Sequence, residues 1–139
     1  MSEVFEKINR DEFGATMIWM RLRYTGHDDD EACFSLVFPN EASNPMGMVQ
    51  GGMMSAALDD ITSATIIDGY NGEKAPLTTD LHVMIHRPLS AGPAKARAKI
   101  IRLGRQVATC EGRLFDASNK LVATMLHSAQ PVTPPSRDG

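Results

Sequence analysis

The feature that most restricts the fold of this chain is the segment from Met53 to about Asp68, which is apolar nearly all the way around a helix. Gly51 and Gly52 stand directly before it. A helix with no polar face lies inside a protein rather than on its surface. The rest of the chain must therefore supply apolar surfaces that enclose this helix.

The remaining sequence has mainly the period-two alternation of strands. Two strands are predicted before the helix and three or four after it, and GHDDDE, DGYNGEKAP, RPLSAGP and DASNK read as turns. The expected strands are residues 18–24, 32–38, 81–85, 94–100, 106–115 and 120–128. One buried helix with five or six mostly consecutive strands predicts an α+β fold in which a curved antiparallel sheet wraps a central helix.

The ends of the chain complete a single domain. With 139 residues the chain is long enough for one core but too short for two. Apolar residues near helical spacing predict an amphipathic helix over about residues 3–14, covering an edge of the domain. The domain is expected over residues 1–130, and the proline-rich residues 131–139 are expected to form a disordered tail.

Composition excludes several classes of protein. The formal net charge of -3 argues against nucleic-acid binding as the main role. Cys33 and Cys110 lack the spacing of a disulfide framework or a zinc site, so no metal is expected. The charged start and the lack of an apolar run of about 20 residues predict a cytoplasmic protein that does not enter a membrane.

The glycine pair before the helix allows two interpretations. The first amides of a helix lack internal partners and carry the positive end of its dipole. Without a Cβ at Gly51 or Gly52, a ligand can approach these amides, and they could hold a carbonyl oxygen that becomes an oxyanion. Alternatively, the glycines only permit a tight junction between loop and helix, and the pair alone favours this second interpretation.

Asp59 changes that balance because a carboxylate in the middle of a buried helix needs compensation. Ser55 and Ser63 lie four residues to either side of it, so the three residues form a polar stripe on an apolar helix. Such a stripe is typical of a wet catalytic groove. Asp60 points about 100° away from Asp59 and is expected to face solvent or to pair with an arginine.

Geometry then implies a second chain. The rise from Gly51 to Asp59 is about 12 Å, whereas both groups would have to lie within about 3 Å of one reacting atom. Two antiparallel copies of the helix satisfy this requirement. A symmetric dimer, with Gly51 from one subunit and Asp59 from the other, is therefore expected to form two complete sites.

These residues resemble the signature N-x-x-G-x-x-H-G-G…D of hotdog-fold acyl-CoA thioesterases of the phenylacetic-acid-degradation type. The matching positions are Asn44, Gly47, Gln50, Gly51, Gly52 and Asp59. LTTDLHVMIHRPLSAG resembles the strand and turn after the family's helix, and GRQVATCEGRLFDASNKLVATMLHSAQ resembles its final hairpin. The resemblance implies a hotdog fold, a homodimer or homotetramer, and acyl-CoA thioester cleavage without metal or redox cofactor.

The resemblance also implies a role for each residue. Gly51 would donate its amide to the thioester carbonyl, and Asp59 would act as nucleophile or as general base on water. Asn44 would position the water or the carbonyl, and Thr78 would hold the attacking water. Ser63 belongs to this set as a member of the polar stripe.

Gln50 departs from the family pattern, which has histidine there. A glutamine can donate a hydrogen bond but cannot take up a proton, so any acid role of that histidine is lost. This departure argues against a hotdog dehydratase or hydratase. His82 and His86 lie on another strand and are expected to be surface or interface residues.

The coenzyme end of the substrate is less defined by the sequence. Arg105 is expected to contact a phosphate of CoA. The neighbouring basic residues are expected to form a solvated face: Lys95, Arg97, Lys99 and Arg102. Gly52 and Met48 are expected to contact the substrate. For the methionines near the glycine turn the core is the favoured interpretation, and their flexible thioethers also suit a pocket for acyl chains.

Two alternatives remain beside the thioesterase. A non-catalytic hotdog protein that binds acyl-CoA is compatible with Gln50, and it predicts binding without release of CoA. A purely structural oligomerisation module predicts neither, and it leaves the polar stripe around Asp59 unexplained.

Overall fold

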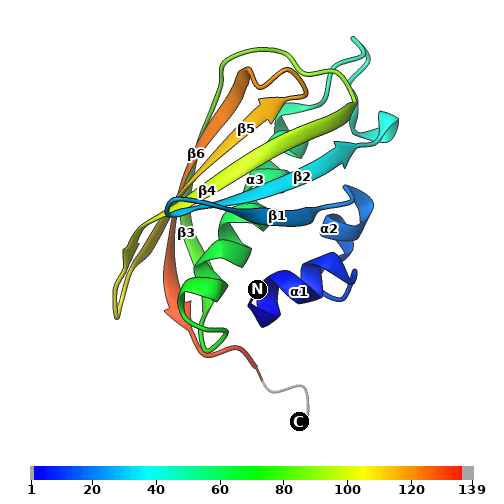
Figure 1. The fold of residues 1–139 in the computed structure, drawn as a ribbon. Coiled ribbons are helices and arrows are strands. Elements are labelled where there is room, and N and C mark those ends of the chain that lie inside the picture. Colours follow the sequence, from blue (N-terminus) through cyan, green and yellow to red (C-terminus); the bar gives the residue numbers. More distant parts are fainter. Residues whose placement is uncertain (1, 136–139) are drawn as a thin grey trace.

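The computed structural model describes residues 2–135, and in it one long helix lies in the concave face of a six-stranded sheet (Figure 1). The helices are α1 (Glu3–Asn9), α2 (Ala15–Trp19) and α3 (Gly51–Gly69), with a short 3-10 helix at Asn40–Ala42. The strands are β1 (Arg23–Asp28), β2 (Glu31–Phe38), β3 (Ala75–Ile85), β4 (Gly92–Leu103), β5 (Ala108–Asp116) and β6 (Leu121–Val132). The predicted α+β fold is confirmed.

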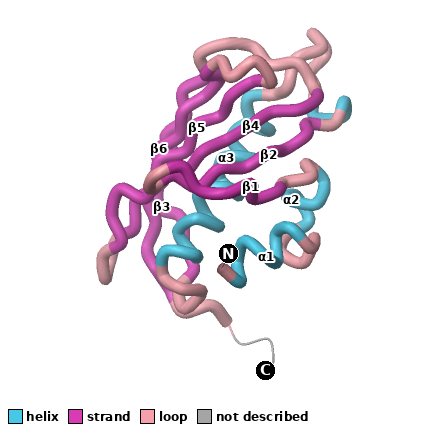
Figure 2. The backbone as a smooth tube through the Cα atoms, in the orientation of Figure 1, coloured by secondary structure: helices cyan, strands magenta, loops and turns pink. Residues whose placement is uncertain are grey.

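All neighbouring strands pair antiparallel, in the order β1-β2-β4-β5-β6-β3. Figure 2 shows this sheet curving around α3, with α1 and α2 beside β1. The two edges differ. β1 is covered on one side by α1, where Phe5 stacks on Tyr24 with ring centroids 4.1 Å apart. β3 forms the other edge, and most of its residues are exposed.

Small residues let α3 lie close to the sheet. Ala94, Ala96 and Ala98 of β4 face the helix and are buried. At Gly112 of β5 the approach is also close, because a Cβ there would lie 2.8 Å from Cγ2 of Thr62. The centre of α3 is thus fixed against β5 and its neighbours.

The N-terminal prediction was wrong in two respects. The helix expected over residues 3–14 ends at Asn9, and Gly14, with extended backbone, precedes a second helix. The strand expected from residue 18 begins only at Arg23. Met17 and Met20 are buried at helical spacing while Ile18 is exposed, so tertiary contacts favour a helix over the apparent alternation.

Other strand boundaries also differ from expectation. β1 continues through Gly26 and His27, which were expected to begin a turn, and β3 begins at Ala75 rather than near Leu81. β6 continues through Val132, two residues into the expected disordered tail, and pairs there with Ala75. The end of that predicted tail, residues 136–139, lies outside the described residues.

Candidate active site

The N-terminus of α3 presents two unpaired amides. Gln50 caps the helix with an extended backbone and makes no side-chain cap bond. The Met53 and Met54 amides both donate to the Gln50 carbonyl oxygen, at 2.9 and 3.1 Å. Within residues 2–135, the amides of Gly51 and Gly52 have no hydrogen-bond acceptor. These two donors, at the positive end of a 19-residue helix, can hold a negative oxygen.

The two glycines differ in their surroundings. A Cβ on Gly51 would lie 2.8 Å from Cδ1 of Ile85, so this glycine lets the start of α3 pack on β3. A Cβ on Gly52 would meet no atom within 4 Å. Packing therefore gives a reason for Gly51, as the tight-junction interpretation expects, but gives none for Gly52.

Asn44 organises the loop that leads into α3. Its Oδ1 accepts hydrogen bonds from the backbone amides of Met46 and Met48, at 2.9 and 3.1 Å. Its own backbone amide donates to the Met48 carbonyl at 2.7 Å. Met48 is half-buried and is joined by a bridge to Ser90. With Oδ1 engaged, Nδ2 is the atom by which Asn44 can donate to a bound group.

Asp59 is less buried than the sequence suggested. Its side chain is 41% exposed, and Ser63 donates a hydrogen bond to its Oδ1 at 3.2 Å. Ser55 instead donates to the Gly51 carbonyl at 2.8 Å, so only one of the two flanking serines binds the carboxylate. Asp59 is thus an oriented and accessible carboxylate rather than an enclosed one.

Asp60 turns the other way and binds a helix that the sequence did not predict. Thr16 of α2 donates to its Oδ2 at 2.5 Å, so the expectation of solvent or an arginine was wrong. Burial raises the pKa of Asp60, and the Thr16 hydrogen bond lowers it in part. The two adjacent carboxylates therefore have separate surroundings.

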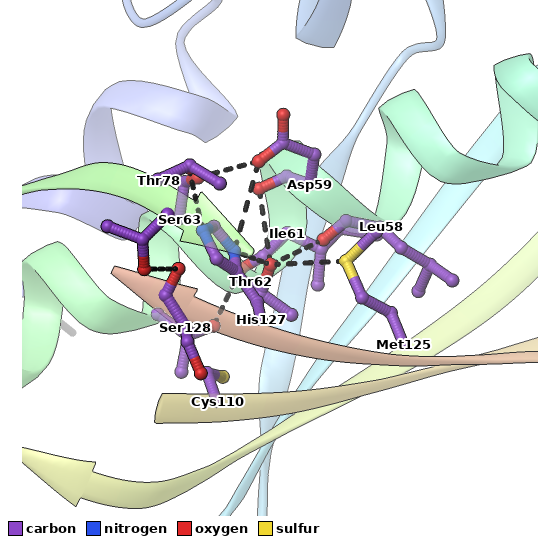
Figure 3. A network of polar contacts seen from close by, with 12 residues as sticks. Leu58, Asp59, Ile61, Thr62, Ser63, Thr78, Cys110, Met125, His127 and Ser128 are labelled. Carbon is purple, nitrogen blue, oxygen red and sulfur yellow. Dashed lines mark hydrogen bonds and ion pairs between the residues drawn. The ribbon is translucent and has the colours of Figure 1, made fainter. Parts of the chain in front are cut away.

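His127 of β6 is the main polar residue of this region that the sequence analysis missed. It is buried, and its ring nitrogens lie 2.7 Å from Oγ1 of Thr62 and 2.8 Å from Oγ1 of Thr78 (Figure 3). Its Nδ1 lies 3.8 Å from Oδ1 of Asp59. Burial lowers the pKa of His127, opposed by the charge of Asp59, so the imidazole is neutral at pH 7.

Thr78 and Asp59, predicted from separate segments, are thus brought to one imidazole ring. Thr78 lies on β3 beside the register shift between Thr78 and Asp80, opposite Ala129 of β6. A weak sequence signal for His127 existed. The inward positions of the last strand, Ala123, Met125, His127 and Ala129, contain one polar side chain, and that side chain needs a polar partner.

The chain does not bring all the predicted site residues together. Gly51 and Asp59 lie on the same helix, about 12 Å apart along its axis. Arg105 lies in the exposed turn between β4 and β5, at the other end of α3, where Tyr70 donates to the Gly104 carbonyl at 2.7 Å. Within one chain, Arg105 and the glycine turn therefore lie at opposite ends of α3.

The basic residues of β4 lie on the outer face of the sheet. A surface cavity of about 570 Å³ is found there, away from α3, and its lining includes Lys95, Arg97 and Arg113. Glu31 binds both arginines, and Asp28 lies 3.0 Å from Arg97. These ion pairs support a solvated face rather than a phosphate site.

No group of three or more His, Cys, Asp or Glu side chains within residues 2–135 is placed to hold a metal ion. No helix in that range has both the length and the hydropathy needed to cross a membrane.

Comparison with known proteins adds a family to this geometry. Residues 40–129 match the family described as the acyl-CoA thioesterase N-terminal domain. No curated protein sequence matches the chain. The matched range begins just before Asn44 and ends just after His127, so it contains both the glycine turn and the polar cluster.

Several solved structures share the fold. A thioesterase from Haemophilus influenzae has a TM-score of 0.83 at 18% identity, over 97% of this chain and 94% of that one. A phenylacetic acid degradation-related protein from Ralstonia eutropha has a TM-score of 0.79 at 28% identity, over 92% and 99%. A Streptococcus mutans protein bound to acetyl-CoA has a TM-score of 0.72 at 11% identity, over 83% and 91%. The expected hotdog fold is confirmed.

Proposed function

Because the chain belongs to the family of acyl-CoA thioesterase N-terminal domains, we propose that it hydrolyses acyl-CoA thioesters to a free acid and CoA. Asp59 acts as base or nucleophile, and the Gly51 amide holds the oxyanion. The site is shared by two subunits. One observation carries the proposal: unpaired amides and an accessible, oriented carboxylate occur on one otherwise apolar helix.

In the general-base form of the reaction, water attacks the thioester carbon and gives a proton to the Asp59 carboxylate. The carbonyl oxygen gains the negative charge, which the Gly51 amide stabilises together with the positive end of α3. Nδ2 of Asn44 orients the carbonyl. The intermediate then collapses, the carbon–sulfur bond breaks, and the thiolate of CoA leaves. In the nucleophilic form, Asp59 attacks first and water cleaves the resulting anhydride.

A dimer through the β3 edge supports the shared site. β3 is an 11-residue edge strand with exposed apolar side chains, among them Leu77, Met84 and Ile85. Such an edge is a template for pairing with another chain. The start of α3 packs against Ile85, so pairing at this edge places the glycine turn next to the partner. A homotetramer formed from two such dimers completes the proposed assembly.

The substrate is an acyl-CoA held partly by surface groups. Gly52 and Met48 lie at the turn where the thioester would bind, and Arg105 is proposed to contact a phosphate. Arg105 lies near the end of α3, ten residues and about 15 Å along the helix axis beyond Asp59 of the same subunit. In an antiparallel dimer, Arg105 would therefore come from the subunit that supplies Asp59, and the coenzyme would extend about this far from the thioester. The acetyl-CoA complex of the Streptococcus mutans protein supports this class of ligand.

The finer assignment within the family is the phenylacetic-acid-degradation branch, with glutamine in place of histidine before the glycine pair. The Ralstonia eutropha protein, at 28% identity, supports this branch. Gln50 is exposed, and its side chain makes no hydrogen bond within the described residues. Its amide is therefore available to donate to the thioester oxygen.

One alternative function is favoured by a specific observation. Gln50 cannot take up a proton, so the turn keeps the groups that bind a thioester but lacks the acid that a histidine would supply. This is compatible with a protein that binds acyl-CoA without cleaving it. Binding alone leaves the orientation of Asp59 by Ser63 without a role, and for this reason hydrolysis is preferred.

The test is a panel of acyl-CoA substrates with a thiol reagent that detects free CoA. The wild type is expected to release CoA, and Asp59→Asn is expected to reduce the rate at least about 100-fold. Asp60→Asn is the matched control, because it changes the adjacent carboxylate, which faces Thr16. A thermal shift with acyl-CoA but no free thiol would establish the binding alternative, and equal loss in both variants would contradict the role of Asp59.

A further inference from the structure

The positions of hydrogen atoms around His127 follow from its contacts. Oγ1 of Thr62 lies 2.7 Å from the Leu58 carbonyl oxygen and 2.7 Å from Nδ1 of His127. A carbonyl oxygen only accepts, and two other acceptors near this hydroxyl are more distant: the Asp59 carbonyl at 3.3 Å and Sδ of Met125 at 3.8 Å. The single hydroxyl hydrogen of Thr62 is therefore directed to Leu58. The contact to Nδ1 is then favourable only if the ring nitrogen donates. His127 therefore carries its proton on Nδ1.

This tautomer determines the direction of the hydrogen bond on the other side of the ring. Nε2 of a neutral imidazole with a protonated Nδ1 can only accept. Oγ1 of Thr78, 2.8 Å away, must donate to it. The hydroxyl hydrogen of Thr78 thus points into the protein, and its lone pairs point outward. Oδ1 of Asp59, 3.8 Å from Nδ1, favours the same tautomer through its negative charge.

We propose that His127 is a positioning residue, which orients the Thr78 hydroxyl so that its lone pairs, and not its hydrogen, face the attacking water. This inference rests on the proposed hydrolysis. The water then donates one hydrogen to Thr78 and the other to Asp59. Its own lone pair remains free to attack the thioester carbon. Without His127 the Thr78 hydroxyl rotates, and it can donate to the water and hold it in an unreactive orientation.

Protonation of His127 reverses the arrangement. With hydrogens on both nitrogens, Nε2 donates to Thr78, and the Thr78 hydrogen turns toward the water. Burial lowers the pKa of His127 from 6.5, so this loss is expected only below that pH. Asp59 of α3 is the charged group facing the ring. Cys110 of β5 lies opposite His127 in the strand register, and its thiol stays protonated, since burial raises its pKa to about 12. From β3, Thr78 binds the ring and Leu81 lies opposite His127 in the strand register, and neither titrates in this range. Asp80 lies opposite Ser128, on the alternate face.

The first test compares kcat, KM and pH profiles of three variants. His127→Leu removes the acceptor and is expected to lower kcat about 10- to 100-fold with little change in KM, because water rather than acyl-CoA is misplaced. His127→Gln restores an acceptor that does not titrate, so it is expected to recover most of kcat and to lose the acid limb assigned to His127. Val122→Ala, at another fully buried position of β6, controls for packing.

The second test does not require turnover. Nitrogen-15 NMR of the imidazole rings distinguishes a protonated from a bare nitrogen, and the His127 signal is identified among the four histidines by its absence in His127→Gln. A protonated Nδ1 and a bare Nε2 are expected at neutral pH, with a change at Nε2 in Thr78→Val.

The outcomes separate the two claims. A protein that releases no CoA from any acyl-CoA refutes the proposed hydrolysis. If CoA is released, a protonated Nε2 at neutral pH, a folded His127→Leu with unchanged kcat, or a Gln variant as slow as the Leu variant would each overturn the role of His127 alone.

Discussion

Gly112→Ala tests the close contact between α3 and the sheet on which the polar cluster depends. The added Cβ would lie 2.8 Å from Cγ2 of Thr62 and 3.2 Å from Cδ2 of Leu58. Carbon atoms in contact prefer about 3.5–4.0 Å, so the first approach is about 1 Å too short. Thr62 is fully buried, and its hydroxyl binds the Leu58 carbonyl and His127, so its methyl group cannot turn aside without breaking these bonds.

The expected loss is that of overpacking a core, about 1–3 kcal/mol in the free energy of unfolding. With an m-value of about 1–3 kcal/mol/M in urea, the midpoint falls by about 1 M. Urea titration followed by circular dichroism measures this. Since the helix must shift or Thr62 must rotate, the variant is also expected to disturb the His127–Thr78 contact and to lower thioesterase activity.

A double-mutant cycle attributes the loss to this contact. Thr62→Ser removes Cγ2 and keeps the hydroxyl, so Gly112→Ala is expected to cost less in that background than in the wild type. The Leu58 contact at 3.2 Å leaves a residual cost. A Gly112→Ala protein as stable as the wild type, or an equal cost in both backgrounds, would show that α3 does not lie against β5 as described.

Three further predictions concern titration and reactivity. Burial raises the pKa of Asp60, so folding favours its neutral form and the wild type loses stability as the pH rises. Urea midpoints measured between pH 4 and 7 are therefore expected to show Asp60→Asn becoming more stable relative to the wild type as the pH rises. A constant difference would contradict this. Burial lowers the pKa of His127, so the unfolded chain binds its proton first; the wild type is expected to lose stability relative to His127→Gln as the pH falls below about 6.5. Burial raises the pKa of Cys110 to about 12, whereas Cys33 is half-buried. A disulfide reagent is therefore expected to modify Cys33 quickly and Cys110 only on unfolding. Two thiols that react quickly in the folded protein would be inconsistent with a buried Cys110.

The sequence predicted those elements whose patterns depend on local spacing. Residues 51–69 are apolar on all sides and have no internal breaker, which allowed α3 to be predicted as the central helix. β5 and β6 alternate regularly around the turn DASNK, and they pair as the predicted hairpin. Both patterns depend on short-range periodicity, which survives folding when burial agrees with it.

Edge elements were harder to predict. DGYNGEKAP reads as a turn that ends at Pro76, so only residues 81–85 of β3 were predicted as a strand. Most residues of β3 are exposed, and an edge strand tolerates proline. Residues 17–20 fit a strand and a helix equally well by apolar spacing, and contacts with α3 favour the helix. These segments required tertiary information that local sequence does not contain.

The candidate site was predicted unevenly for a similar reason. Gly51, Asp59 and Ser63 lie on one helix, so their relation follows from the helical repeat. His127 contacts Thr62 and Thr78, which are 65 and 49 residues away. Its place in the site depends on the pairing of β3 with β6, and this pairing could not be derived from spacing along the chain.

The central claim, that each site takes an amide from one subunit and a carboxylate from the other, is tested most directly by mixing two inactive chains. Gly51→Pro removes the amide hydrogen at the first helical position, where the backbone tolerates proline. The Cβ that proline adds must displace Cδ1 of Ile85, which is the free end of an exposed side chain. Asp59→Asn removes the carboxylate charge. In a mixed dimer, one site combines the intact Gly51 of the second variant with the intact Asp59 of the first.

After denaturation and refolding of the two variants in equal amounts, about half of the dimers are mixed and one of their two sites is intact. The account predicts that thioesterase activity recovers to about a quarter of the wild-type value. Activity no higher than that of the separate variants, in a sample shown by mass spectrometry to contain mixed dimers, would contradict it.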